Sequence, residues 1–267
     1  MEKKTLLMPV LFIGHGTPMN AIENNEFSNK WKELGKSLPR PKAILCISAH
    51  WESQDSMVTA MDKPKTIHDF GGFPDELYRQ QYPAPGSPTL ANSIQNNINA
   101  FNIKMDHQWG IDHGSWCFLK HAYPDANIPV LQLSIDYTQK MQYHYDLGKE
   151  LAFLRRAGIL IVGSGNMVHN LRLARPSEKG FNSEFAYEWA QSLNCIMKEK
   201  ILSGDHNSMI NYLTLHKEAV LGIPSEEHYI PLIYTLALQE QGEEIEIFND
   251  KIVTGALSMT SLVIGSI

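Results

Sequence analysis

Three histidines of this chain stand at or shortly after the ends of short apolar segments. The segments and their histidines are Val10–Ile13 with His15, Ala43–Ile47 with His50, and Ile159–Val162 with His169. Continuous apolar segments of this length are typical of strands that are buried on both faces. In open α/β sheets, ligands bind in the crevice beyond the carboxyl ends of the strands. We therefore expect these three imidazoles to lie in one cleft.

A fourth histidine, His228, stands in a segment that is typical of a helix start. Ser225 is a good N-cap residue, and it predicts His228 at the third helical position, from which a side chain can reach a neighbouring crevice. The carboxylates of Glu226 and Glu227 suit the first turn of a helix for electrostatic reasons alone. We therefore assign them no chemical role.

Two further histidines lie in glycine-containing loops. His113 is flanked by glycines and by Trp109 and Trp116, which indicates a tight loop at the wall of a pocket. His68 precedes residues 69–74, where paired glycines allow a close approach of the backbone. Both side chains are candidates for contact with a ligand, and His68 is equally suited to anchoring its own loop.

This set of histidines points to a metal site. Imidazoles that converge without cysteine thiolates suit zinc or iron(II). Three neutral histidines leave the ion its double positive charge, so an open coordination position can acidify water or bind an ionisable substrate hydroxyl. A fourth histidine that does not bind the ion can act as acid and base near neutral pH. The HExxH, GxSxG and Walker-type patterns do not occur in the sequence. Their absence counts against the hydrolases and nucleotide-binding enzymes that those patterns mark.

The composition and charge exclude several kinds of partner. The chain has 267 residues, of which 43% are hydrophobic, and its 23 Lys and Arg against 29 Asp and Glu give a net charge of −6. Binding to phosphates requires clustered Lys and Arg, so we expect neither nucleic acid nor a membrane surface as a partner. The 3 cysteines are odd in number and far apart, which excludes a disulfide framework and favours a reducing cytoplasm.

The chain is predicted to form one domain over residues 1–267, because no repeat, low-complexity segment or linker divides it. The N-terminal apolar stretch from Thr5 to Gly14 contains Pro9 and lacks a cleavage site of small residues. We interpret this stretch as the first buried strand rather than as a signal peptide. No stretch reaches the roughly 18 apolar residues that a membrane helix requires.

Strand-like and helix-like segments alternate along the chain. Val130–Ile135 is a fourth strand-like segment, and Gln139–Ala157 has apolar residues at helical spacing and stops at Gly158, a typical helix-ending residue. The polar segment from Ser177 to Val220 also has apolar residues at near-helical spacing, and we expect it to cover one side of the sheet. This alternation predicts a layered α/β fold with a largely parallel or mixed sheet.

Seven short motifs, in this order, resemble those of one enzyme family. They are Gly14-His-Gly-Thr-Pro-Met19, Ser48-Ala-His-Trp51, His68-Asp-Phe-Gly-Gly-Phe-Pro74, Tyr82-Pro-Ala-Pro-Gly-Ser-Pro88, Trp109-Gly-Ile-Asp-His-Gly-Ser-Trp116, Gly165-Asn-Met-Val-His-Asn170 and Glu227-His-Tyr229. The chain is thereby similar to the DOPA 4,5-dioxygenase branch of the class III extradiol ring-cleavage dioxygenases, from residue 10 to about residue 265. The resemblance implies a single three-layer α/β domain with a central mixed, largely parallel sheet. It also implies insertion of dioxygen into a catechol ring beside the two hydroxyls, which gives a ring-opened semialdehyde acid.

The resemblance also implies roles for individual residues. It makes His15, His50 and His228 the metal ligands and places His169 beside the metal as the acid-base residue. The wider superfamily has a glutamate where this chain has His228, so three histidines replace a set of two histidines and one carboxylate. We add His113 as a second catalytic candidate that would hydrogen-bond to bound oxygen or substrate. The candidates for substrate binding are His68, Phe73, Trp109 and Trp116.

The resemblance implies non-haem iron(II) as the active cofactor, because dioxygen chemistry requires it, with a catechol and dioxygen as the small-molecule partners. A neutral, nitrogen-rich site also binds zinc tightly, so we expect zinc in purified protein. Two other functions remain open for the same imidazoles. They are a zinc-dependent hydrolase on a related α/β scaffold and a non-catalytic metal-binding relative. Oxygen consumption with a catechol separates the first function from these two.

Overall fold

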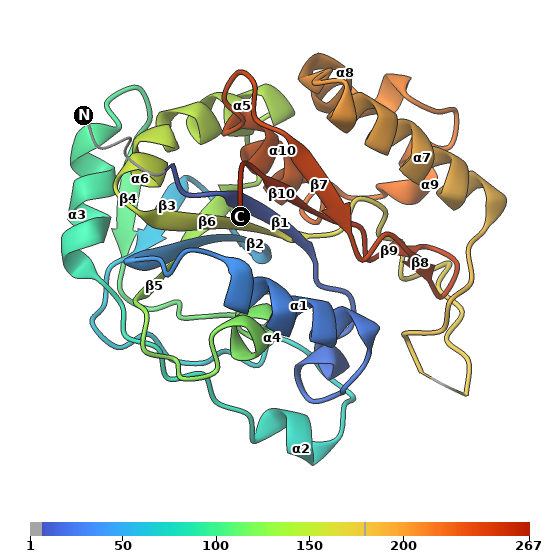
Figure 1. Cartoon of the computed structure of the whole chain (residues 1–267), viewed down its shortest axis with the longest axis horizontal. Coiled ribbons are helices and arrows are strands. Elements are labelled where there is room, and N and C mark those ends of the chain that lie inside the picture. Colours follow the sequence, from blue (N-terminus) through green and yellow to red (C-terminus); the bar gives the residue numbers. More distant parts are fainter. Residues whose placement is uncertain (1–6, 179) are drawn as a thin grey trace.

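An eight-stranded mixed sheet forms the centre of the molecule (Figure 1). The computed structural model describes residues 7–178 and 180–267. From one edge to the other, the strands are β4 (Ile103–Asp106), β3 (Ser56–Thr59), β5 (Val130–Asp136), β2 (Ala43–Ser53), β6 (Ile159–Gly165), β1 (Val10–Gly14), β10 (Ser261–Ile264) and β7 (Ile245–Phe248). The inner strands β5, β2, β6 and β1 are parallel, and β3 and β10 run antiparallel to their inner neighbours. The prediction of a mixed, largely parallel sheet is confirmed.

The four predicted strand segments form the four inner strands. These strands begin at Val10, Ala43, Val130 and Ile159, which are the first residues of the predicted segments. Helices cover both faces of the sheet, and this is why β1, β2 and β6 begin with continuous apolar residues, whereas β5 also carries Gln132 and Ser134. The residues of the N-terminal stretch before residue 7 lie outside the described part of the chain.

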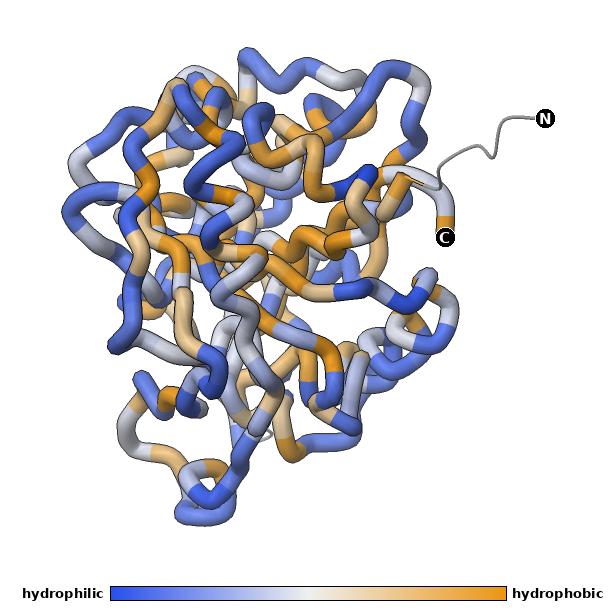
Figure 2. The backbone as a smooth tube through the Cα atoms, turned by 90° about the vertical axis from the view of Figure 1, so that its left-hand side faces the viewer, coloured by the Kyte–Doolittle hydropathy of each residue, from blue (hydrophilic) through white to orange (hydrophobic). Residues whose placement is uncertain are grey.

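The sheet separates two hydrophobic cores. Val10 and Phe12 of β1 lie in one core, whereas Leu11 and Ile13 lie in the other, because successive strand residues face opposite sides. One face is covered by α1 (Glu26–Ser37) and α4 (His113–Ala122), and the other by α3 (Pro88–Asn97), α5 (Met141–Glu150), α6 (Ala152–Arg156), α7 (Glu188–Leu202) and α10 (Ile230–Ala237) (Figure 1). Hydrophobic segments run through the middle of the molecule, and hydrophilic segments surround them (Figure 2). The three-layer prediction is confirmed.

Short elements complete the described part of the chain. They are η1 (Pro18–Ala21), α2 (Asp75–Tyr78), α8 (His206–Ile210), η2 (Tyr212–Thr214), α9 (Ala219–Gly222) and the two-stranded sheet of β8 (Ile252–Val253) and β9 (Leu257–Ser258). Within residues 7–178 and 180–267, no helix is both long enough and apolar enough to cross a membrane. Cys46, Cys117 and Cys195 are unpaired.

The predicted helix over residues 139–157 is present as two helices. α5 and α6 meet at Leu151, whose N–H bonds to the carbonyl of Gly148, three residues back, instead of continuing the α-helical pattern. Gly158 follows the end of α6 with a φ of 85°, as expected for a helix-ending glycine. In the segment 177–220, the long helix α7 begins only at Glu188, so Phe185 lies outside it and is 45% exposed.

The prediction that a helix begins after Ser225 is wrong. α10 begins at Ile230, where Pro231 suits the first turn because it lacks an N–H and has a fixed φ. The Ser225 hydroxyl bonds to Glu227 Oε1 at 2.9 Å rather than capping a helix. His228 therefore lies in the turn before α10 and not on a helix.

Arg155 is a fully buried cation that holds distant parts of the chain together. Its side chain donates to the carbonyls of Met8 and Leu238 at 2.8 and 2.6 Å. It also pairs with both oxygens of the Glu243 carboxylate, at 2.7 and 2.5 Å. Removing one partner of a buried pair leaves an uncompensated charge, so we expect Glu243→Gln to lower the free energy of unfolding by about 3 kcal/mol in urea denaturation.

The neighbouring pair of Arg156 with Glu240 provides the control for this prediction. Its side chains are 56% and 35% exposed, and exposed pairs contribute about 1 kcal/mol at most. Glu240→Gln is therefore expected to change the free energy of unfolding by less than about 1 kcal/mol. Equal losses in the two variants would contradict the special role of the buried pair.

Candidate active site

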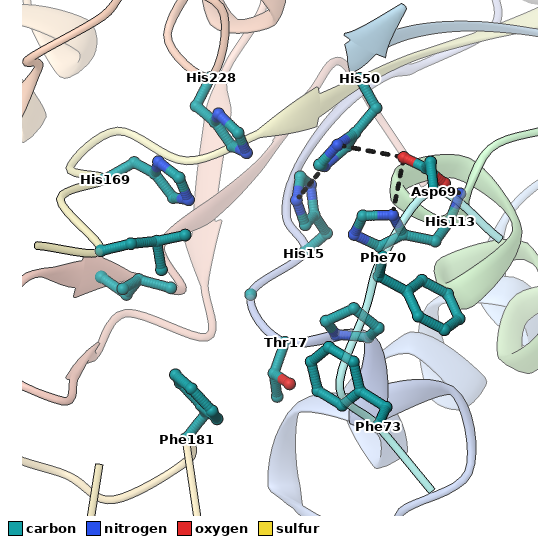
Figure 3. A pocket seen from close by; sticks show the side chains of 14 residues that line it. His15, Thr17, His50, Asp69, Phe70, Phe73, His113, His169, Phe181 and His228 are labelled. Atoms are coloured by element: carbon teal, nitrogen blue, oxygen red, sulfur yellow. Dashed lines mark hydrogen bonds and ion pairs between the residues drawn. The ribbon is translucent and has the colours of Figure 1, made fainter. Parts of the chain in front are cut away.

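Histidines from three separate parts of the chain converge at the carboxyl edge of the inner strands (Figure 3). His15 directly follows β1, His50 lies in β2, and His228 lies in the turn before α10. One nitrogen from each ring lies within 4.8 Å of the others. The Nε2 atoms of His15 and His50 are 3.1 Å apart. This spacing suits three nitrogen ligands around one metal ion.

An irregularity in β2 presents His50. The sequence predicted the end of this strand near Ile47, but β2 continues to Ser53. Its pairing with β5 shifts in register between Ile47 and Glu52, as occurs where extra residues bulge from a strand. Its pairing with β6 stops at Ser48. His50 therefore lies within the strand, at a bulge that turns its side chain toward the end of β6 and β1.

The ring of His15 is oriented by a chain of two hydrogen bonds. The Ser164 hydroxyl donates a hydrogen bond to the carbonyl of Gly114 at 2.5 Å. Its oxygen can therefore accept a hydrogen bond from its other neighbour, His15 Nδ1, at 3.1 Å. This assignment places the imidazole proton of His15 on Nδ1. The lone pair of Nε2 then faces the cluster.

The other two rings are oriented by carboxylates. His228 Nδ1 donates to Glu227 Oε1 at 3.1 Å, and His50 Nδ1 lies 3.2 Å from Asp69 Oδ2. Metal-binding histidines characteristically place their second nitrogen against a carboxylate or another oxygen in this way. All three rings thus direct Nε2 lone pairs toward one region.

Burial keeps these imidazoles neutral. Desolvation, followed by repulsion from the neighbouring histidines, lowers the pKa of His15 and His228 well below the usual value. Desolvation also lowers the pKa of His50 to about 3, although Asp69 opposes the shift. Lone pairs of neutral nitrogens at such short distances repel one another unless a proton on one of them or a cation lies between them. The donor set therefore fits a divalent metal ion.

Asp69 connects His50 with a fourth histidine, His113, the first residue of α4. Asp69 Oδ1 accepts from the backbone N–H of His113 at 3.0 Å, and Oδ2 lies 3.0 Å from His113 Nδ1, off the direction of a linear hydrogen bond. Burial opposes ionisation of this carboxyl, but the contacts with His113 and His50 outweigh it and lower the pKa to about 2. Asp69 is therefore an anion that faces two rings of the cluster.

His169 lies on the other side of His228. The two rings stack with centroids 3.5 Å apart and an angle of 6° between their planes. Burial lowers the pKa of His169 to about 4. Its ring nitrogens make no hydrogen bond to any residue in the described part of the chain. His169 is thus a neutral imidazole whose polar atoms remain available to a ligand.

The histidines form the polar end of a cavity of about 260 Å³. This volume is close to the lower limit of the roughly 300–1,000 Å³ that is usual for ligand sites, so it suits a small molecule. The side chains that line the cavity away from the histidines are mainly apolar: Pro18, Phe70, Phe73, Leu171, Phe181 and Leu257 (Figure 3). A flat apolar ring with polar groups on one edge is complementary to this arrangement.

Comparison with known proteins identifies the family. The family described as the catalytic LigB subunit of aromatic ring-opening dioxygenase matches residues 9–264. The chain belongs to this family. A relative from Escherichia coli (strain K12), named 4,5-DOPA dioxygenase extradiol, is 45% identical over 262 residues, which cover 97% of this chain and 95% of the relative. A Beta vulgaris protein of the same name is 37% identical over 268 residues, 98% of both chains.

A solved structure supports the same assignment for this LigB-family chain. The crystal structure of an uncharacterized protein from Escherichia coli K12 matches with a TM-score of 0.83 and 40% sequence identity, and the match covers 97% of this chain and 100% of that chain. The predicted resemblance to the class III extradiol dioxygenases is confirmed, and so is the prediction of an extradiol ring-opening dioxygenase.

The structure brings together most, but not all, of the residues that the sequence singled out in this LigB-family chain. His15, His50, His113, His169, His228 and Phe73 all line the cavity. His68, Trp109 and Trp116 do not appear in its lining. His68 contacts the carbonyl of Gln80, Trp109 stacks on Trp51, and the buried Trp116 donates to the carbonyl of Ile67. We therefore leave these three residues out of the proposed substrate contacts.

Sequence reasoning missed several residues of the LigB-family site. Asp69 lies next to His68 in a quoted motif, but its contact with two histidines depends on loops that the sequence does not place. Phe70 lies in the same motif and lines the cavity. Gly16, Thr17 and Pro18, which follow His15 in its motif, also line the cavity, whereas Leu171, Phe181 and Leu257 lie in segments without any distinctive pattern.

Proposed function

We propose that the chain is a metal-dependent extradiol dioxygenase that opens the ring of a DOPA-like catechol by 4,5-cleavage and releases a ring-opened semialdehyde acid. The observation that carries this proposal is the convergence of His15, His50 and His228 at the polar end of an apolar cavity, with the His169 ring stacked on His228 beside them. Membership of the LigB family supplies the reaction class.

His15, His50 and His228 would hold the metal ion. When bound, iron(II) would supply positive charge that favours ionised catechol oxygens, and electrons that allow dioxygen to react. We propose iron(II) as the active metal. Zinc is the expected contaminant of purified protein, because nitrogen-rich sites bind it tightly.

His169 would accept a proton from a catechol hydroxyl during the reaction, after the substrate has bound. Burial lowers its pKa to about 4, so the ring is neutral at physiological pH and has a lone pair that can accept a proton once the charge of the bound ion lowers the pKa of the catechol hydroxyl. The ring lines the cavity, and its nitrogens make no hydrogen bond to residues 7–178 or 180–267, so they are available to a substrate hydroxyl, as a general base requires. The same ring would return the proton to a product oxygen later in the reaction.

Other residues would position the substrate and exclude water. Phe70 and Phe73 line the cavity, and aromatic side chains suit contact with an aromatic ring. His113, held at its backbone by Asp69, would hydrogen-bond to the oxygen atoms of substrate or dioxygen. The apolar walls would keep water from the reacting oxygens.

The names of the relatives make DOPA the first catechol to assay. We expect metal-stripped protein, loaded anaerobically with iron(II), to consume one dioxygen per DOPA or other cleaved catechol and to form a yellow product. An oxygen electrode and absorbance spectra would measure both. Zinc-loaded protein is the matched control and is expected to consume none.

One result would overturn the proposed activity. If iron is bound and none of a panel of catechols leads to oxygen uptake, the site performs different chemistry. A zinc-dependent hydrolase or a non-catalytic metal-binding protein would then account better for the three converging imidazoles.

A further inference from the structure

The first turn of α4, residues Asp112 to Ser115, makes contacts that the proposed mechanism does not use. It starts with a carboxylate that is fully buried, 0% exposed, although a buried charge is costly unless hydrogen bonds satisfy it. His113 within this turn lines the cavity, but Asp112 does not. The position of this carboxylate therefore calls for an explanation other than substrate binding.

Asp112 is bonded to the strand that carries His50. Its Oδ1 accepts from the Ser48 hydroxyl at 2.7 Å and from the backbone N–H of Ser115 at 3.2 Å. Ser48 lies on β2 at the start of the bulge, and its Oγ also accepts from the backbone N–H of His50 at 3.3 Å. Asp112 and Ser48 thus tie the bulge of β2 to the N-terminus of α4.

Gln132 on β5 fixes the orientation of the Asp112 carboxylate. Gln132 Nε2 donates to Asp112 Oδ2 at 2.8 Å, while Gln132 Oε1 accepts from the Asp112 backbone N–H at 2.9 Å. The same Nε2 donates to Ser115 Oγ at 2.9 Å. With donors on both oxygens, the carboxylate has little freedom to turn, so the position of Ser48 is fixed as well.

The same turn supports His15 through its backbone. The carbonyl of Gly114 accepts a hydrogen bond from Ser164 Oγ, which in turn accepts one from the Nδ1–H group of His15. Gly114 also lets the turn approach β2 closely: a Cβ at this position would lie 2.7 Å from Ser48 Oγ and 2.9 Å from His50 Cδ2. The turn therefore contacts the supports of two of the three proposed ligands.

We propose that the first turn of α4 sets the relative orientation of His15 and His50, with Asp112, Ser48 and Ser164 as positioning residues for the metal site. This inference rests on the proposed function, because it assumes that His15 and His50 bind a metal ion. Residues that orient metal ligands typically change metal affinity or activity by 10- to 100-fold when they are replaced.

Metal binding tests the inference without reference to catalysis. Ser48→Ala and Ser164→Ala each remove one hydroxyl that links α4 to a ligand. We expect each to weaken zinc binding about 10-fold or more, in competition with a chromogenic chelator, and to alter the visible spectrum of the cobalt(II)-loaded protein. Asp112→Asn keeps the size of the side chain but loses an acceptor, and the same changes are expected if it folds.

Ser134→Ala is the matched control. Ser134 is buried on β5 and makes two hydrogen bonds, to Ser53 and to the backbone of Met57, but none to the histidine cluster. This variant is expected to keep wild-type zinc affinity and the wild-type cobalt spectrum, whatever its thermal stability.

Two results would overturn the inference. The first would leave the proposed metal site standing, and the second would overturn that site as well. If the unchanged chain binds zinc but Ser48→Ala and Ser164→Ala bind it as tightly as Ser134→Ala does, the turn does not orient the ligands, and the proposed metal site stands. If the unchanged chain binds neither zinc nor cobalt(II), the proposed metal site fails together with the inference.

Discussion

Replacing His15 with alanine is expected to abolish oxygen uptake and to weaken metal binding by more than about 100-fold, the upper end of the effect of losing a supporting residue. His15 is central to the cluster, because its Nε2 lies 3.1 Å from that of His50 and its ring lies 5.4 Å from that of His228. Without His15, only two of the proposed ligands remain. Metal content after dialysis and oxygen uptake with a catechol would measure the two effects.

The control for this prediction is His216→Ala. His216 lies near Glu218, outside the cavity lining, so its loss is expected to leave metal content and oxygen uptake unchanged. Free imidazole offers a second check, since it can enter the space left by the His15 side chain and restore part of the activity. Retention of full metal binding by His15→Ala would contradict its assignment as a ligand.

The central part of the fold follows from local sequence patterns. Three of the four inner strands, β1, β2 and β6, begin with continuous apolar residues because both of their faces are buried, whereas β5 has the same burial but carries Gln132 and Ser134. The edge strands β4 and β7 have four residues each and are partly exposed, so their pattern is weak. Their places in the sheet depend on pairing between distant segments rather than on local preference.

Three histidines of the site were predictable for the same reason, because His15, His50 and His169 stand at or shortly after the ends of apolar segments. Their supports were not. Asp112 bonds to Ser48, 64 residues away, and Ser164 bonds to Gly114, 50 residues away. Such contacts exist only after the sheet and α4 have packed together. For His228, the local sequence was misleading. Ser225 has the chemistry of a helix cap, but α10 begins only at Ile230, where Pro231 suits the first turn.

His169→Phe is expected to reduce kcat by about 100- to 10,000-fold, the usual contribution of general acid-base catalysis, while metal binding persists. Phenylalanine keeps a flat ring that can stack on His228, as the imidazole does at 3.5 Å. It has no nitrogen that could accept the proton of a catechol hydroxyl. The variant therefore separates proton transfer from support of the neighbouring ligand. Stopped-flow oxygen uptake and zinc affinity would measure the two properties.

Substrate binding provides the decisive comparison for His169. Anaerobic titration with a catechol is expected to give a dissociation constant within a few-fold of wild type, because the apolar walls and the three ligands are unchanged. A loss confined to kcat then assigns the proton to His169. If His169→Phe keeps more than about one-tenth of the wild-type kcat, far above the 100-fold loss expected, another group moves the proton. Glu227 would be the first candidate, since one of its oxygens lies within 4.8 Å of a His169 nitrogen.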